Sequence, residues 1–262
     1  MPDLITILAI AGAAAIASPV GGLIAVWRSP TTLFQSTALG FASGVLLATI
    51  CFEMIPQALD AAALGVVVGG FVAGFLAVYS FDLYIHGGQL AGEKADQRPR
   101  TLRYYRHRRP RGGEATVLAG GTSAEEVIEG LSIGIGAALR PGLGLMIGLA
   151  IVVDNLSEGL GIGELILTEP SGGGRREQAR RILGWTGLIG VALLASAVVG
   201  WLFLRDLPQA ALGGLVAAGG GGMLYLTITD LVPGAEEYQY QQSAAISVAA
   251  GFVLILVLSS FM

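Results

Sequence analysis

Eight long runs of apolar residues follow one another along the chain, and polar positions interrupt each run only rarely. A helix needs roughly 20 apolar residues to cross the hydrocarbon core of a bilayer. The runs lack the two-residue alternation of a membrane β-barrel, so the expected fold class is all-α, with one polytopic membrane domain over residues 1–262. The runs predict membrane-spanning helices at residues 4–27, 33–59, 61–85, 115–139, 142–168, 182–204, 209–232 and 243–262.

Composition narrows the class of protein further. Hydrophobic residues make up 53% of the chain, charged residues make up 13%, and the mean hydropathy is +0.70. Soluble domains carry roughly 25% charged residues, so these values argue against an ordinary soluble enzyme. With one cysteine, Cys51, the chain has no disulfide scaffold, and its apolar content excludes intrinsic disorder.

The basic residues predict how the chain sits in the membrane. Of the 15 Lys and Arg residues, all but Arg140 and Arg205 lie in the connections after the first, third and fifth runs, including the basic loop 87–114. Basic residues favour the cytoplasmic side, so both termini are expected outside, in a bacterial inner membrane. The basic stretch 98–111 is interpreted as a topology signal beside anionic lipid, and no nucleic-acid partner is expected.

Two pairs of motifs recur in mirrored order along the chain. Gly130-Leu-Ser-Ile-Gly134 in the fourth run is repeated as Gly159-Leu-Gly-Ile-Gly163 in the fifth. The second run ends Glu53-Met-Ile-Pro56, and the seventh ends Asp230-Leu-Val-Pro233. Because the paired runs cross the membrane in opposite directions, they predict an inverted repeat of two three-helix arms around a two-helix core. Such repeats are typical of secondary transporters, whose substrate site lies near the bilayer midplane.

Polar residues that could carry chemistry gather in the fourth and fifth runs. Residues four apart share a helix face, and no Lys or Arg lies inside any run to balance the negative charge. Each charged side chain at mid-membrane costs about 2.5–3.5 kcal/mol, which either protonation or a bound cation would relieve. We expect a multi-oxygen cation site, formed by Glu125, Glu126, Glu129, Asp154, Asn155 and Glu158.

Other functions for the same carboxylates stay open. Protonated carboxyl groups could simply join helix to helix by hydrogen bonds. An intramembrane metal-dependent hydrolase would use them to activate water, but no histidine lies inside the runs. A proton-linked carrier of an organic cation would add aromatic residues, and the fourth and fifth runs contain none. We therefore expect a transporter and no enzyme, with no resident cofactor.

The same segments resemble a known family. Glu125-Glu-Val-Ile-Glu129-Gly and Asp154-Asn-Leu-Ser-Glu158-Gly look like the fourth- and fifth-helix signatures of the ZIP metal transporters, which typically read His-Asn-x-Pro-Glu-Gly and His-Glu-x-Pro-Glu-Gly. The second and seventh runs also resemble that family, especially its prokaryotic branch, so the resemblance covers essentially the whole chain. It implies that the primary metal ligands fall on Glu125, Glu129, Asp154 and Glu158, and that positions serving a second metal fall on Glu126 and Asn155.

This chain also departs from the ZIP pattern. Both signature histidines are carboxylates here, Ile128 and Ser157 replace both signature prolines, and the sixth run offers no acidic ligand for a second metal. A site made mostly of oxygen favours harder ions such as Mn²⁺ or Fe²⁺ over Zn²⁺, whereas the family favours zinc or iron. The prediction is therefore uptake into the cytoplasm of a divalent cation of the zinc, iron and manganese class.

Weaker predictions concern the ends of the runs. Glu53 and Asp230 could guide ions at entrance and exit, and Asp82 and Glu164 could take part in release; solvated interfacial acids are the alternative for all four. His86 and His107 are expected to be solvated loop residues. The G-x-x-x-G pairs let helices approach closely, with a homodimer surface as one use; they are Gly40/Gly44, Gly70/Gly74, Gly130/Gly134, Gly144/Gly148 and Gly159/Gly163.

Overall fold

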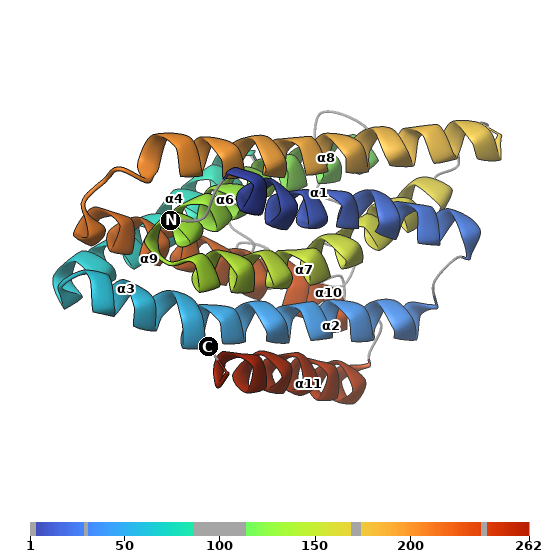
Figure 1. Cartoon of the computed structure of the whole chain (residues 1–262). Coiled ribbons are helices and arrows are strands. Elements are labelled where there is room, and N and C mark those ends of the chain that lie inside the picture. Colours follow the sequence, from blue (N-terminus) through green and yellow to red (C-terminus); the bar gives the residue numbers. More distant parts are fainter. Residues whose placement is uncertain (1–3, 29–30, 86–113, 169–173, 237–239, 262) are drawn as a thin grey trace.

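The computed structural model describes residues 4–28, 31–85, 114–168, 174–236 and 240–261 (Figure 1). All secondary structure within these residues is helical, which confirms the expected fold class. The basic loop up to residue 113, with His86 and His107, lies outside the described residues. The first three segments are α1 (Leu4–Trp27), a continuous helix made of α2 (Thr32–Thr49), the π-helix η1 (Ile50–Met54) and α3 (Ile55–Ala61), and α4 (Leu64–Ile85).

Five further segments complete the described fold. The two carboxylate-bearing segments are α6 (Glu114–Leu139) and α7 (Pro141–Thr168), and α8 (Arg175–Leu204) follows them. The next segment mirrors the second one, because it also contains a π-helix near its end. It comprises α9 (Gln209–Leu226), η3 (Thr227–Leu231) and α10 (Val232–Glu236), and the last helix is α11 (Gln241–Ser259).

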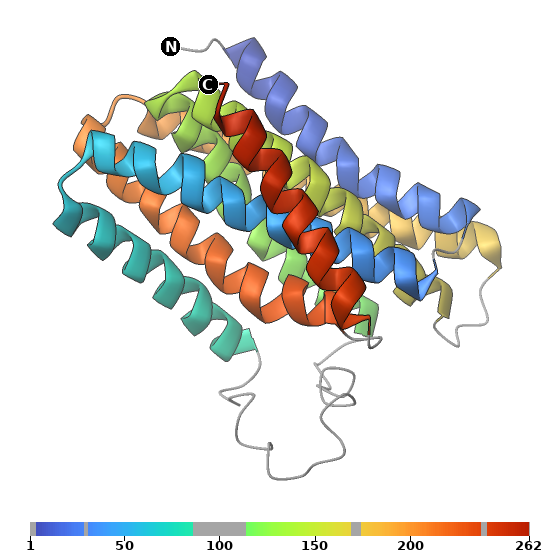
Figure 2. The same ribbon diagram turned by 90° about the horizontal axis from the view of Figure 1, so that it is seen from below.

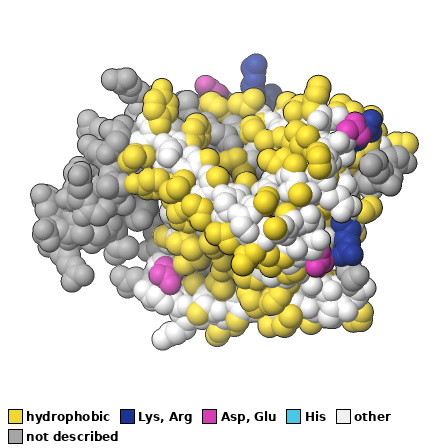
Figure 3. Space-filling model, turned by 90° about the vertical axis from the view of Figure 1, so that its left-hand side faces the viewer, with side chains coloured by type: hydrophobic (Ala, Val, Ile, Leu, Met, Phe, Trp, Pro, Cys, Tyr) yellow, Lys and Arg dark blue, Asp and Glu magenta, His cyan; other side chains and the backbone are white. Residues whose placement is uncertain are grey.

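Seven of these described segments are long and apolar enough to cross a membrane. The exception is α6, whose 26 residues are sufficient in length. Every membrane-length stretch of α6 contains Glu125, Glu126 and Glu129, which lower its hydropathy. Hydrophobic side chains also dominate the face seen in Figure 3, with only isolated charged ones. The chain is a multi-pass membrane protein, and the start of α1 and the end of α11 lie at the same end of the bundle (Figure 2).

The helix limits and the predicted spans differ most at the start of α8. α8 begins at Arg175, seven residues before the predicted start at Ile182. The added turns contain mainly Arg, Glu, Gln and Ala, which are polar or small but strong helix formers. Arg175 Nη2 also donates a hydrogen bond to the carbonyl oxygen of Val26 at 2.6 Å, which ties the start of α8 to the end of α1. Apolar character alone therefore marks the apolar part of α8 and not its polar first turns.

Helix packing divides the bundle into two groups of four. In the first group, α1 and α6 each pack against both α7 and α8. In the second group, α2 packs against α11, and α4 packs against α9. The groups meet mainly where α6 contacts α9 and where α2 contacts α7. The predicted repeat pairs α1 with α8, α2 with α9, α4 with α11 and α6 with α7. Exchanging the members of each pair maps every one of these contacts either onto another of them or onto itself, so the packing agrees with the predicted inverted repeat.

Glycine allows the closest of these helix contacts. A Cβ atom on Gly159 would meet the backbone of Ser18 in α1, and one on Gly130 would meet Leu193 and Ser196 in α8. The same holds for Gly44 against Val248 of α11. All five G-x-x-x-G pairs have at least one glycine pressed against a neighbouring helix of the same chain. They serve contacts within the chain, and the homodimer stays a prediction.

Candidate metal centre

The α6–α7 hairpin brings the predicted residues to one depth. Glu126 and Asp154 each lie fourteen residues from Arg140, which occupies the turn between the two helices. At a rise of 1.5 Å per residue, both side chains therefore lie about 21 Å from the turn. This position is close to the middle of both helices.

Most of the six predicted side chains are shielded from the surface. The exposed fraction is 1% for Glu126, 5% for Glu129, 3% for Asp154 and 0% for Asn155. Glu125 and Glu158 are half-buried. A carboxylate in such surroundings needs hydrogen-bond donors or a cation, because leaving a charge buried and unpaired is costly.

Asn155 is the best-connected member of this set. Its Nδ2 donates to Glu126 Oε2 at 3.3 Å and to the carbonyl oxygen of Ala14 at 3.1 Å. The amide therefore joins α7 to both α6 and α1. Ser196 Oγ of α8 donates to the backbone carbonyl of Glu126 at 3.2 Å. Glu126 is thus held by two other helices of the first group.

The remaining carboxylates gather around Asp154. The side chains of Glu129 and Asp154 are close neighbours across α6 and α7. Glu125 and Glu158 are electrostatic neighbours of Asp154 as well. The hairpin therefore concentrates acidic groups from both helices in one region, as their spacing along the chain suggested.

Five oxygen atoms of this region are buried without a hydrogen-bond partner among the described residues. A buried acceptor that lacks a partner costs about 1–3 kcal/mol, and more when it is charged. Only three other buried side-chain atoms in the described chain share this condition, on Ser18, Gln57 and Trp201. The five unpartnered oxygens are Glu126 Oε1, Glu129 Oε2, Asp154 Oδ1, Asn155 Oδ1 and Glu158 Oε2. Such atoms are suitable ligands for a hard divalent cation.

The oxygens do not form a finished coordination sphere in this conformation. Across the described residues, no three His, Cys, Asp or Glu side chains are arranged to hold one metal ion. The predicted convergence of Glu125, Glu129, Asp154 and Glu158 on a single ion stays a prediction. What the structure contains is a set of neighbouring acidic groups with unused oxygens.

The residues predicted at entrance and exit have different surroundings. Asp230 in η3 is exposed, yet it is an electrostatic neighbour of Glu125, Asp154 and Glu158. Its mirror-related counterpart Glu53, in η1, is only 4% exposed and accepts a hydrogen bond from Gln57 Nε2 at 2.7 Å. Asp230 therefore lies nearer the acidic region than a residue at a helix end was expected to lie.

The two residues predicted to assist release are both half-buried. Asp82 of α4 accepts a hydrogen bond from the hydroxyl of Tyr225 at 2.6 Å, and it is an electrostatic neighbour of Glu125. Glu164 lies on α7, six residues beyond Glu158.

Tyr225 and Ser196 were not singled out from the sequence, since their contacts come from helices distant along the chain. The contact between Gln57 and Glu53 could have been predicted from the sequence, because the two residues are one helical turn apart and share a helix face.

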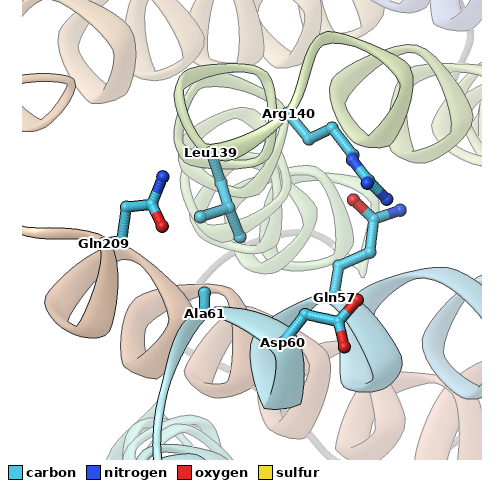
Figure 4. A pocket seen from close by; sticks show the side chains of 6 residues that line it. All are labelled: Gln57, Asp60, Ala61, Leu139, Arg140 and Gln209. Atoms are coloured by element: carbon cyan, nitrogen blue, oxygen red, sulfur yellow. The ribbon is translucent and has the colours of Figure 1, made fainter.

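A cavity of about 160 Å³ lies at the end of the bundle that holds the α6–α7 turn (Figure 4). It is distant from the acidic region, because Arg140 lines it. Its other lining residues come from α3, from the end of α6 and from the start of α9. The full set is Gln57, Asp60, Ala61, Leu139, Arg140 and Gln209.

Comparison with known proteins finds no family model that matches this chain. The chain is similar, however, to proteins named zinc transporter ZupT from Salmonella paratyphi A (strain ATCC 9150 / SARB42), Salmonella newport (strain SL254) and Salmonella enteritidis PT4 (strain P125109). Each is 26% identical over 261 residues, which cover 97% of this chain and 94% of the relative. The similarity therefore extends over nearly the whole chain.

Proposed function

We infer that this chain is a transporter of the ZIP family, and that it carries divalent metal cations across a membrane. The signatures in α6 and α7 support this inference, and so does the similarity to zinc transporters over nearly the full length. The same similarity favours a transporter over an intramembrane hydrolase. It also favours a metal ion over an organic cation as substrate.

The observation that carries the proposal is the group of unpartnered buried oxygens on α6 and α7. Hydrogen bonds between protonated carboxyl groups would pair such oxygens with one another. In this chain Glu129 Oε2 and Asp154 Oδ1 have no hydrogen-bond partner among the described residues, although the two side chains are neighbours. Five acceptors without donors fit a site for a cation better than a purely structural network.

Five of the six site residues have a proposed role as ligands. Glu129 and Glu158 are ligands for any divalent ion, whereas Glu125 and Asp154 replace nitrogen ligands and make the site harder. Asn155 contributes its free Oδ1 while its Nδ2 holds Glu126 in place. The relatives are named as zinc transporters, whereas a site made mostly of oxygen favours a harder ion such as Mn²⁺. Uptake of Zn²⁺ and Mn²⁺ therefore tests which ion the site prefers.

The proposed direction of transport is into the cytoplasm of a bacterium, across its inner membrane. Arg28, Arg175 and Arg176 lie at the end of the bundle that the distribution of basic residues assigns to the inside, and Arg140 lies at the other end. Glu53 lies on the outer side of the acidic region, and Asp230 lies on the inner side. We propose that ions pass from Glu53 to the α6–α7 site and leave past Asp230.

Uptake into proteoliposomes tests this function. Initial rates of Zn²⁺ and Mn²⁺ uptake should fall at least tenfold in Glu129→Ala and in Glu158→Ala, because each variant removes a shared ligand. Glu177→Ala is the matched control, since it removes one carboxylate from the exposed first turn of α8. Wild-type uptake rates in both ligand variants, with the protein still monodisperse, would disprove the site.

A further inference from the structure

The cavity at the outer end lies between the two groups of helices. Gln57, Asp60 and Ala61 belong to α3, and Gln209 begins α9, so one wall comes from the second group. Leu139 and Arg140 form the opposite wall, at the turn that joins the two carboxylate-bearing helices of the first group. Any relative movement of the two groups would change the width of this cavity.

Two opposite charges face the cavity from its two walls. Asp60 and Arg140 are both exposed, and these two described side chains form no ion pair with each other in this conformation. Figure 4 shows the Arg140 side chain extending across the cavity toward Gln57, with Asp60 beside Gln57 on the same helix. The guanidinium group is therefore directed at the wall that carries the carboxylate.

Gln57 provides a second acceptor on that wall. Its Nε2 is occupied by Glu53, but its Oε1 is buried and has no hydrogen-bond partner among the described residues. A guanidinium group has five N–H donors in a planar fork, and it can bind a carboxylate and a carbonyl oxygen together. Asp60 and Gln57 present these two acceptors one helical turn apart.

We propose that Asp60 and Arg140 form a charge latch at the outer end of the protein. When the cavity narrows, Arg140 binds Asp60 and the free oxygen of Gln57. This joins the α6–α7 turn to α3 and closes the outer approach to Glu53. The proposal rests on the proposed function, because it assigns a means of controlling access to the same transport path. A solvent-exposed ion pair shifts an equilibrium between two states by up to about fivefold.

Labelling of a cavity residue tests the latch without any transport. Cys51→Ser removes the single native cysteine, and Ala61→Cys places a thiol on the cavity wall. Into this background go D60N, R140Q and the charge swap D60R/R140D. An uncharged, membrane-impermeant maleimide should label both single variants about two- to fivefold faster than the parent, because each variant breaks the latch. The charge swap should restore the parental rate.

The matched control is the exposed ion pair of the neighbouring turn, in which Arg205 Nε lies 3.8 Å from Asp206 Oδ2. R205Q and D206N change the charge at the same end of the bundle and should leave the labelling rate unchanged. Opposite effects of D60N and R140Q would overturn the latch, because the charges would then act only on the reactivity of the thiol. Failure of the swap to restore the rate in a monodisperse protein would overturn it as well.

Uptake measurements separate the latch from the proposed function. Initial Zn²⁺ uptake in proteoliposomes should change in the same direction in D60N and R140Q, and the swap should restore it. If labelling follows the latch pattern but no variant and no parent transports Zn²⁺ or Mn²⁺, the transport function fails and the latch stands. If the parent transports and labelling does not follow the pattern, the latch fails alone.

Discussion

Asn155 Nδ2 lies 3.3 Å from Glu126 Oε2, and this hydrogen bond joins the two helices that carry the acidic residues. The same nitrogen donates to the carbonyl oxygen of Ala14 in α1. One amide group therefore holds three helices at the depth of the candidate site. Its position explains why an amide is present among five carboxylates, since a carboxylate could not donate to either acceptor.

Replacement of Asn155 by alanine should weaken both the fold and the site. The variant removes the donor to a buried carboxylate oxygen, which should lower the free energy of unfolding by about 1–3 kcal/mol. Thermal unfolding in detergent measures this loss. Ser247→Ala is the control, because Ser247 Oγ bonds only to Ser243 of its own helix and the change should be small. Equal melting temperatures for Asn155→Ala and wild type would contradict the assigned role.

The replaced histidines offer a test of ion selectivity. Glu125→His combined with Asp154→His adds two softer nitrogen donors and removes up to two negative charges. Preference for Zn²⁺ relative to Mn²⁺ should therefore rise by roughly tenfold, by the logic of ligand softness. Initial uptake rates for each ion in vesicles give the ratio. An unchanged ratio in a folded variant would mean that Glu125 and Asp154 do not contact the ion.

Metal affinity should depend on pH in a defined direction. Protons and metal ions compete for the same carboxylate oxygens, so binding should weaken as the pH falls from about 8 to about 5. Titration of purified protein with Mn²⁺ at several pH values measures the dissociation constant directly. The Glu129→Ala and Glu158→Ala variants should show a smaller dependence, because each has one carboxylate fewer. A constant affinity over this range would argue against a carboxylate site.

Close packing at Gly159 can be tested against a neighbouring glycine. A Cβ at position 159 would overlap the Ser18 carbonyl of α1, whereas a Cβ at Gly161 meets nothing within 4 Å. Gly159→Ala should therefore destabilise the protein by about 1–3 kcal/mol through overpacking. Gly161→Ala should be neutral or slightly stabilising, because alanine favours the helix. Melting temperatures of the two variants give the comparison, and equal values would show that α1 and α7 are less tightly packed than described.

Much of the helical organisation could be predicted from hydropathy, because a membrane span must be long and apolar. The first helix has the predicted limits, Leu4 and Trp27. The polar start of α8 was not predicted, since Arg175–Arg181 lies before the apolar run and its helical state depends on propensity and on the contact with Val26. Hydropathy detects the part of a helix inside the bilayer and misses a polar extension beyond it.

The π-helices were not predicted, although the sequence holds a local reason for them. Pro56 follows η1 and Pro233 follows η3, and proline can neither donate to the carbonyl one turn earlier nor pack closely against it. A widened turn before each proline relieves that conflict. π-bulges are frequent at functional sites, and here the widened turns contain Glu53 and Asp230. A carboxylate three residues before a proline was visible in both motifs.

The candidate site was only partly predictable. Spacing along α6 and α7 indicated which acidic residues share a depth and a helix face. It could not indicate that Asp230 is an electrostatic neighbour of Glu125, or that Ala14 and Ser196 contact the site residues, because these relationships depend on how distant helices pack. The arrangement of the oxygens around an ion also depends on the conformational state, which a sequence pattern does not encode.

The acidic content of α6 has a consequence for biogenesis. Glu125, Glu126 and Glu129 make this helix the poorest substrate for the translocon among the eight, because each charge opposes partition into lipid. Asn155, the hydrogen-bonding partner of Glu126, leaves the ribosome only after the 25 residues that separate it from Glu129. Efficient integration of α6 should therefore await α7, so that the two helices enter the bilayer as a hairpin. The acidic residues that suit this protein to binding a cation therefore also make the insertion of α6 the least favourable step of its integration into the membrane.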